Sequence, residues 1–119
     1  MLKRVYAKFR LEGFHNWKDA GKHSTEGYLS NNHRHIFHFK ISAEVGGDNR
    51  EIEFISMGRV IKSLIQAKFA NEDDYCVFGE MSCEMIANEV IPMMQEKYGN
   101  RTYMVDVSED GENGCVIIG

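Results

Sequence analysis

Proline and cysteine are scarce in this chain, whose 119 residues include one proline and three cysteines. Cys76, Cys83 and Cys115 form no Cys-x-x-Cys pair, so the sequence indicates neither a disulfide framework nor a structural zinc knuckle. Unpaired thiols are typical of a reducing compartment. No apolar run is long enough to span a bilayer, and the N-terminus lacks the apolar core of a signal peptide. We therefore expect a cytoplasmic protein without a membrane partner.

Concentrated positive charge is also missing. The chain has 14 Lys and Arg residues against 18 Asp and Glu, which gives a formal net charge of −4, and the basic residues do not cluster. Binding to nucleic-acid phosphates needs a concentrated basic surface, so we expect no nucleic-acid partner. The 43% hydrophobic content is enough for a core, and the length fits one domain over residues 1–119.

Alternating hydrophobicity predicts strands at both ends of the chain. A period of two over residues 2–15 and 33–45 predicts two half-buried strands. Residues 102–109 and 115–118 predict a hairpin near the C-terminus. After a Gly-Gly-Asp-Asn turn we also expect a short returning strand over residues 51–55.

A helical period replaces this alternation in the middle of the chain. Apolar spacing predicts one helix that begins after an N-cap at Ser56 and a second that runs from Ser82 to Tyr98. The order ββααββ predicts an α+β fold, an antiparallel four-stranded sheet with two helices on one face. The sheet edges and uncovered face then predict a homo-oligomer. Residues 16–32 form a long loop, and loops of this length are usually functional.

Three histidines lie at odd-numbered positions, which also carry the apolar side chains of the two predicted strands. His33 and His35 open the second strand, and His15 ends the first. If these strands pair antiparallel, the three imidazoles meet at one end of one sheet face. Three histidines with an open fourth position are a common ligand set for zinc, so we predict a site for zinc or another divalent metal. The alternative is three partly buried histidines satisfied by neighbouring polar groups.

The order of these motifs resembles that of the 6-pyruvoyl- and 6-carboxytetrahydropterin synthase family. Residues 9–15 and 33–41 are similar to the family's aromatic strand that ends in His and to its His-x-His strand. Residues 51–62 resemble its short strand and first helix. Ser82-Cys83-Glu84 resembles the opening of its second helix, and residues 105–109 resemble the strand that ends in a pterin-anchoring glutamate.

The resemblance implies a tunnelling fold, in which the sheets of several subunits close into a barrel. It also implies zinc on the three histidines and a small-molecule heterocycle bound by Glu109, with Glu84 as a further substrate-binding residue. A carboxylate can accept the ring N–H and the exocyclic amino group of a pterin as a bidentate pair. Without the resemblance, Glu109 would be interpreted as an exposed turn acid beside Asp110.

The chain departs from the family pattern in three places. Residues 27–32 lack the catalytic cysteine, Arg34 replaces the glycine between the two histidines, and residues 73–76 lack the Asp-His pair. The usual lyase chemistry therefore lacks its acid and base. The catalytic residues stay unassigned, with three candidates as substitutes: His23, Glu26 and Cys76.

Three functions are consistent with these observations. The chain is a divergent zinc-dependent lyase acting on a substrate like dihydroneopterin triphosphate, a binding module that kept the metal and heterocycle pocket, or a structural oligomer. Turnover separates the first from the second, and metal content separates both from the third.

Overall fold

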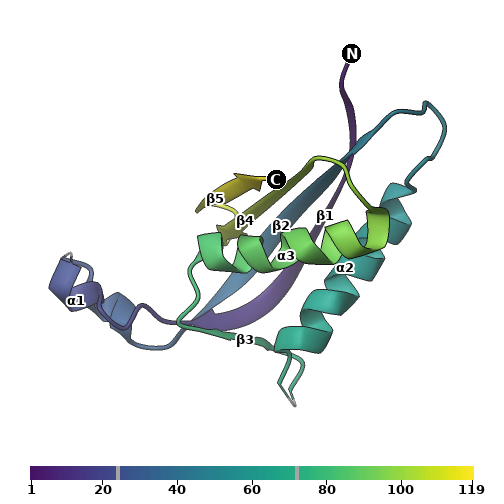
Figure 1. Ribbon diagram of the computed structural model, residues 1–119. Coiled ribbons are helices and arrows are strands. Elements are labelled where there is room, and N and C mark those ends of the chain that lie inside the picture. Colours follow the sequence, from purple (N-terminus) through teal and green to yellow (C-terminus); the bar gives the residue numbers. More distant parts are fainter. Residues whose placement is uncertain (24, 72) are drawn as a thin grey trace.

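The computed structural model describes residues 1–23, 25–71 and 73–119, without the side chain of His23. It has an α+β fold, as predicted, with one mixed sheet in the strand order β3-β1-β2-β4-β5 (Figure 1). The described elements are the strands β1 (Lys3–His15), β2 (His33–Val45), β3 (Cys76–Gly79), β4 (Tyr103–Glu109) and β5 (Asn113–Ile118), the helices α1 (Ala20–His23), α2 (Phe54–Phe69) and α3 (Cys83–Tyr98), and the 3-10 helix η1 (Gly27–Ser30).

The four strands expected from hydrophobic alternation form an antiparallel series. β1 pairs with β2 along its whole length, from Lys3 opposite Val45 to His15 opposite His33. β4 lies on the other side of β2 and pairs with β5 at the sheet edge. This register places the end of β1 beside the start of β2, as expected from the sequence, so that the three histidines lie close together on one face of the sheet.

A fifth strand, β3, makes the sheet mixed and differs from the four-stranded antiparallel prediction. It runs parallel to β1, with Cys76 opposite Gly13. Its four residues are too short for a clear period of two, although Cys76 and Phe78 are buried and Val77 is exposed. Gly13 permits this close packing, because a Cβ atom there would lie 2.8 Å from the Phe78 ring.

The predicted returning strand over residues 51–55 is wrong, because α2 already begins at Phe54. The Glu53 carboxylate caps this helix by accepting the backbone N–H groups of Ile55 and Ser56, at 3.0 and 2.7 Å. These two bonds lower the pKa of Glu53. Ser56 therefore lies in the first turn and is not the N-cap. Ser, Thr, Asp and Asn are the usual capping residues, so a glutamate cap was not anticipated.

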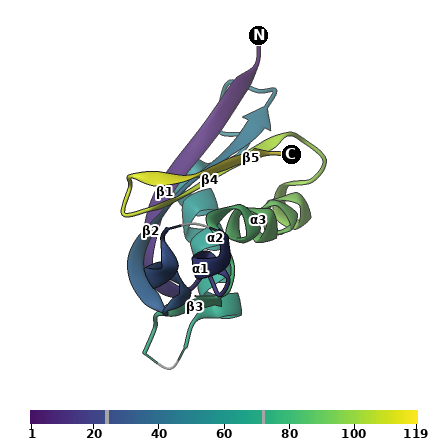
Figure 2. The same cartoon turned by 90° about the vertical axis from the view of Figure 1, so that its left-hand side faces the viewer.

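Helices α2 and α3 pack on the same face of the sheet, and both views show this arrangement (Figures 1 and 2). α3 begins at Cys83, close to the predicted start at Ser82, and ends at Tyr98 as predicted. Ser82 is its N-cap, with Oγ accepting the Met85 N–H, and Gly99 follows the helix with a φ of 84°. A left-handed conformation of this kind favours glycine at the end of a helix. The core lies between this helical layer and the sheet, and its fully buried side chains include Phe37, Phe39, Ile61, Ile86 and Met94.

Residues 16–32, expected to be a loop, contain two short helical segments, α1 and η1. In Figure 1 they extend from the end of the sheet where β1 ends and β2 begins. Two backbone hydrogen bonds fix the start of this segment: Asn16 N–H donates to the Gly79 carbonyl oxygen, and Trp17 N–H donates to that of Leu29. Among the described residues, no helix has both the length and the apolarity to cross a membrane.

Candidate metal centre

The structure brings the three predicted histidines together at one end of the sheet. His15 and His33 are directly paired across β1 and β2, and His35 follows two residues later on the same face. The ring centroid of His15 lies 4.5 Å from that of His33 and 5.6 Å from that of His35. His15 is buried, with 7% of its surface exposed, while His33 and His35 are half-buried.

Backbone carbonyl groups fix the orientation of two of these imidazoles. His15 Nδ1 lies 3.0 Å from the Met81 carbonyl oxygen, and His33 Nδ1 lies 2.9 Å from that of Asn31. A carbonyl oxygen can only accept a hydrogen bond, so each Nδ1 carries the proton. In the neutral ring Nε2 then keeps its lone pair, which is the form that binds a metal.

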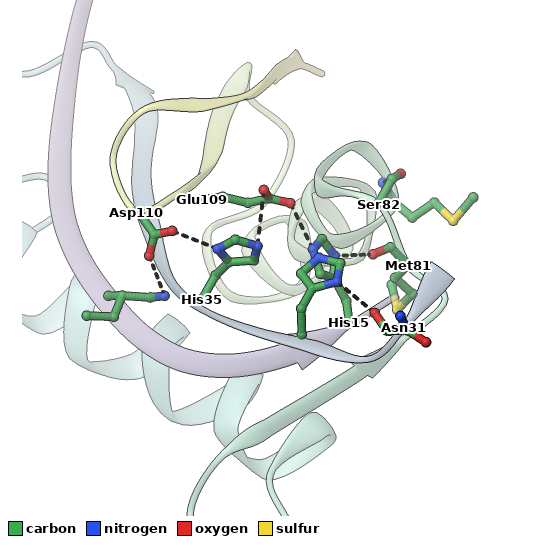
Figure 3. A network of polar contacts seen from close by, with 10 residues as sticks. His15, Asn31, His35, Met81, Ser82, Glu109 and Asp110 are labelled. Carbon is green, nitrogen blue, oxygen red and sulfur yellow. Dashed lines mark hydrogen bonds and ion pairs between the residues drawn. The ribbon is translucent and has the colours of Figure 1, made fainter. Parts of the chain in front are cut away.

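A carboxylate does the same for the third imidazole. His35 Nδ1 donates to Asp110 Oδ2 at 2.6 Å, and Asp110 Oδ1 accepts the backbone N–H of Ile36 at 2.9 Å (Figure 3). These bonds lower the pKa of Asp110, the Ile36 N–H having the larger effect. A carboxylate behind a metal-binding histidine is a common outer-shell arrangement. Sequence reasoning treated Asp110 as a turn residue, and only its position after Glu109 would have pointed to this role.

Glu109, at the end of β4, faces the other side of the rings. Its Oε1 lies 2.8 Å from His15 Nε2 and its Oε2 lies 3.5 Å from His35 Nε2 (Figure 3). These contacts would be ion pairs if the imidazoles were protonated. However, burial lowers the pKa of His15, and this effect exceeds the opposing influence of Glu109. Neither Nε2 atom makes an aligned hydrogen bond in the described structure.

The arrangement therefore places electron pairs against one another. With its proton on Nδ1, a neutral His15 turns the Nε2 lone pair toward a carboxylate oxygen 2.8 Å away, an arrangement that is repulsive unless a proton or a metal ion binds there. One potential ligand atom from each of His15, His33, His35 and Glu109 lies within 4.8 Å of the others. Tetrahedral coordination with Zn–N bonds of about 2.0–2.1 Å places the ligand atoms about 3.3–3.4 Å apart, so metal binding requires the most widely separated ligand atoms to approach one another by up to about 1.4 Å through side-chain rotation.

The donor set fits a borderline-soft divalent metal. Imidazole nitrogens suit zinc, copper, iron and nickel, and a carboxylate is an accepted fourth ligand for zinc. Magnesium and calcium prefer sites made of oxygen ligands, so three nitrogens disfavour them. The four residues can thus hold a zinc-like ion.

A cavity of about 570 Å³ opens beside this group. That volume lies in the range of small-molecule sites. The residues that line it include His15, His33 and Glu109 of the metal group, together with Glu80 and Glu84. The apolar side chains that line it are Trp17, Leu29, Met81 and Met85.

The remaining sequence-predicted residues are placed as follows. Glu84 is exposed, lies in the first turn of α3 and lines the cavity. Glu26 is exposed and immediately precedes η1. Cys76 is fully buried in β3, is not among the described residues lining the cavity, and has its pKa raised to about 11 by burial. The side chain of His23 lies outside the described residues.

Cys83 is a cavity residue that sequence reasoning did not consider for chemistry. It opens α3, lines the cavity and is buried. Burial, reinforced by the nearby Glu109 and Glu84 charges, raises its pKa to about 12. The thiol is therefore protonated at neutral pH, and the thiolate needed for nucleophilic or base chemistry is suppressed.

A scan against protein-family models finds no match, and a search of curated proteins finds no significant similarity.

Proposed function

We propose that this protein binds a divalent metal, most simply zinc, through His15, His33 and His35, and a pterin- or purine-like heterocycle in the adjacent cavity. The observation that carries the proposal is the short contact between His15 Nε2 and Glu109 Oε1, in which an imidazole lone pair and a carboxylate oxygen face one another at 2.8 Å. A cation between these two atoms removes the repulsion and gives the unpartnered nitrogen a bond.

Glu109 has two roles in this proposal. Without a ligand, its carboxylate completes the fourth coordination position. When a heterocycle docks, the same carboxylate accepts the ring N–H and the exocyclic amino group, which form a bidentate donor pair. Its position between the histidines and the cavity supports both roles. Zinc, when bound, supplies a Lewis acid that polarises a hydroxyl or carbonyl oxygen of the ligand.

Binding is supported better than turnover. A pterin-synthase-like lyase needs a group that takes a proton from the substrate and another that returns it. The cavity thiol, Cys83, is held in its protonated form, and Cys76 is buried in the sheet. We therefore propose a divergent relative of the pterin synthases that keeps the metal and ring sites, with slow lyase activity on a dihydroneopterin-triphosphate-like substrate as the second candidate.

Assembly into a homo-oligomer is part of the proposal. β5 lies at a sheet edge, and its Val116 and Ile118 are 50% and 65% exposed. An exposed apolar edge strand is a template for pairing with another chain. The resemblance to the pterin synthases suggests that such pairing closes the subunits into a barrel in the cytoplasm.

Calorimetry with neopterin tests the ring site, using zinc-loaded protein and protein stripped of metal. We expect binding to the loaded protein that weakens after stripping, and a parallel product assay with dihydroneopterin triphosphate that shows little turnover. Absence of neopterin binding by the loaded protein would refute the heterocycle site, and brisk turnover would show that the chain is an enzyme.

A further inference from the structure

The cavity beside the metal centre is lined by charges of one sign. Among the described residues that line it, the acidic side chains are Glu80, Glu84 and Glu109, and neither lysine nor arginine contributes. Phosphate groups are normally recognised by arginine or lysine side chains or by helix N-termini. The side chains of this cavity therefore supply carboxylate acceptors and lack the usual partners of a phosphate.

The helix N-terminus at the cavity is already occupied by the protein's own oxygen atoms. α3 begins at Cys83, and the positive end of its dipole would favour an anion. The Glu84 carboxylate lies in this first turn, and Ser82 Oγ accepts the Met85 N–H at 3.2 Å. These groups compete with a phosphate for the N-terminus of α3.

A second feature favours interpreting the cavity as a ligand site beside the metal centre and not merely as an acidic surface. His15, which is 7% exposed, lines the cavity and has an Nε2 atom without a hydrogen-bond partner. Apolar side chains, Trp17 and Met85 among them, line the same cavity. Apolar walls with a few convergent polar groups are typical of sites for small, largely flat ligands.

We propose that the cavity takes an unphosphorylated nitrogen base, neutral or cationic, whose adjacent N–H donors face the carboxylates, and that it discriminates against phosphorylated forms of the same base. This inference rests on the proposed heterocycle site and specifies its ligand class. The three carboxylates outnumber the two positive charges of a bound zinc ion, so the loaded site keeps a net negative charge. Glu109 accepts the N–H groups of the base, and Glu80 and Glu84 repel a polyphosphate tail.

A matched pair of probes tests the inference. Calorimetry on the zinc-loaded protein compares neopterin with neopterin triphosphate, which share the ring and differ in the phosphates. We expect neopterin to bind at least about tenfold more tightly at low ionic strength, a difference of about 1.4 kcal/mol. In about 0.5 M salt the difference in affinity between the two probes should become smaller, because salt screens partly exposed charges.

Charge-neutral variants identify the source of the preference. In the double variant Glu80→Gln and Glu84→Gln, the ratio of the dissociation constants of neopterin triphosphate and neopterin should fall by about threefold or more, because two repelling charges are removed. The double variant Glu89→Gln and Glu96→Gln is the control, because neither the half-buried Glu89, which pairs with Lys68, nor the exposed Glu96 lines this cavity. An unchanged preference in the cavity variant would overturn the inference.

The possible outcomes separate the two proposals. Tighter binding of the triphosphate than of neopterin would overturn the inference and leave the heterocycle site intact. Binding of neither probe would refute the heterocycle site, and the inference with it.

Discussion

Asp110 offers the most selective perturbation of the metal centre. Its two carboxylate oxygens accept from two different donors, His35 Nδ1 at 2.6 Å and Ile36 N at 2.9 Å. An asparagine has one acceptor oxygen and one NH₂ group, so in either orientation of the amide one of the two donors meets another donor. If the oxygen stays with Ile36, His35 relieves the conflict by moving its proton to Nε2, which removes the metal-binding lone pair.

The size of the effect follows from the role of such outer-shell groups. Loss of a carboxylate behind a metal-binding histidine typically costs about tenfold to hundredfold in metal affinity, or about 1.4–2.8 kcal/mol. We therefore expect Asp110→Asn to weaken zinc binding by that factor. The fold should be preserved, because asparagine tolerates the left-handed backbone of Asp110, whose φ is 55°.

The assay is a zinc titration in competition with a chromophoric chelator, combined with nitrogen NMR of the histidine rings to identify the tautomer of His35. Asp74→Asn is the matched control, since Asp74 has a similar φ of 64° and is not among the four residues of the metal group. Unchanged zinc affinity in Asp110→Asn, or a loss of the same size in both variants, would refute the reasoning.

Further predictions concern the ring, the sheet, the thiols and the assembly. Glu109→Gln should weaken neopterin binding about tenfold to hundredfold in calorimetry, through loss of a charge-assisted bond, while the three histidines retain the metal. Gly13→Ala should lower the free energy of unfolding in a urea titration by about 1–3 kcal/mol, because its Cβ would meet Phe78 at 2.8 Å. Mass spectrometry after iodoacetamide treatment at neutral pH should show slow labelling of Cys76 and Cys83, whose raised pKa values of about 11 and 12 suppress the thiolate, and fast labelling in denaturant. Light scattering should give an oligomeric mass, and a monomer at all concentrations would contradict the edge-pairing argument.

The sequence predicted the placement of the histidines well because strand parity is a local property. The period of two puts His33 and His35 on one face whatever lies elsewhere, and antiparallel pairing of the two long strands brings His15 opposite His33. The helix predicted from Ser82 to Tyr98 was equally accessible, because helical apolar spacing is also a local signal.

The features that were missed depend on contacts between distant segments. β3 has four residues, and its place in the sheet depends on the absence of a side chain at Gly13, more than sixty positions earlier. Two partners of the imidazole Nδ1 atoms, Met81 and Asp110, lie 66 and 75 positions from His15 and His35, whereas Asn31 is only two positions from His33. Alternation and spacing carry no information on such pairings, which tertiary structure determines.

The measurement that tests the central claim most directly is the metal content of protein purified without a histidine tag or chelators. Elemental analysis should find about one zinc-like ion per chain, as expected for a single site with three histidine ligands. The His33→Ala and His35→Ala variants should lose it while keeping the wild-type circular dichroism spectrum. Wild-type protein that stays free of metal after incubation with zinc, or stoichiometric metal retained in both variants, would contradict the account.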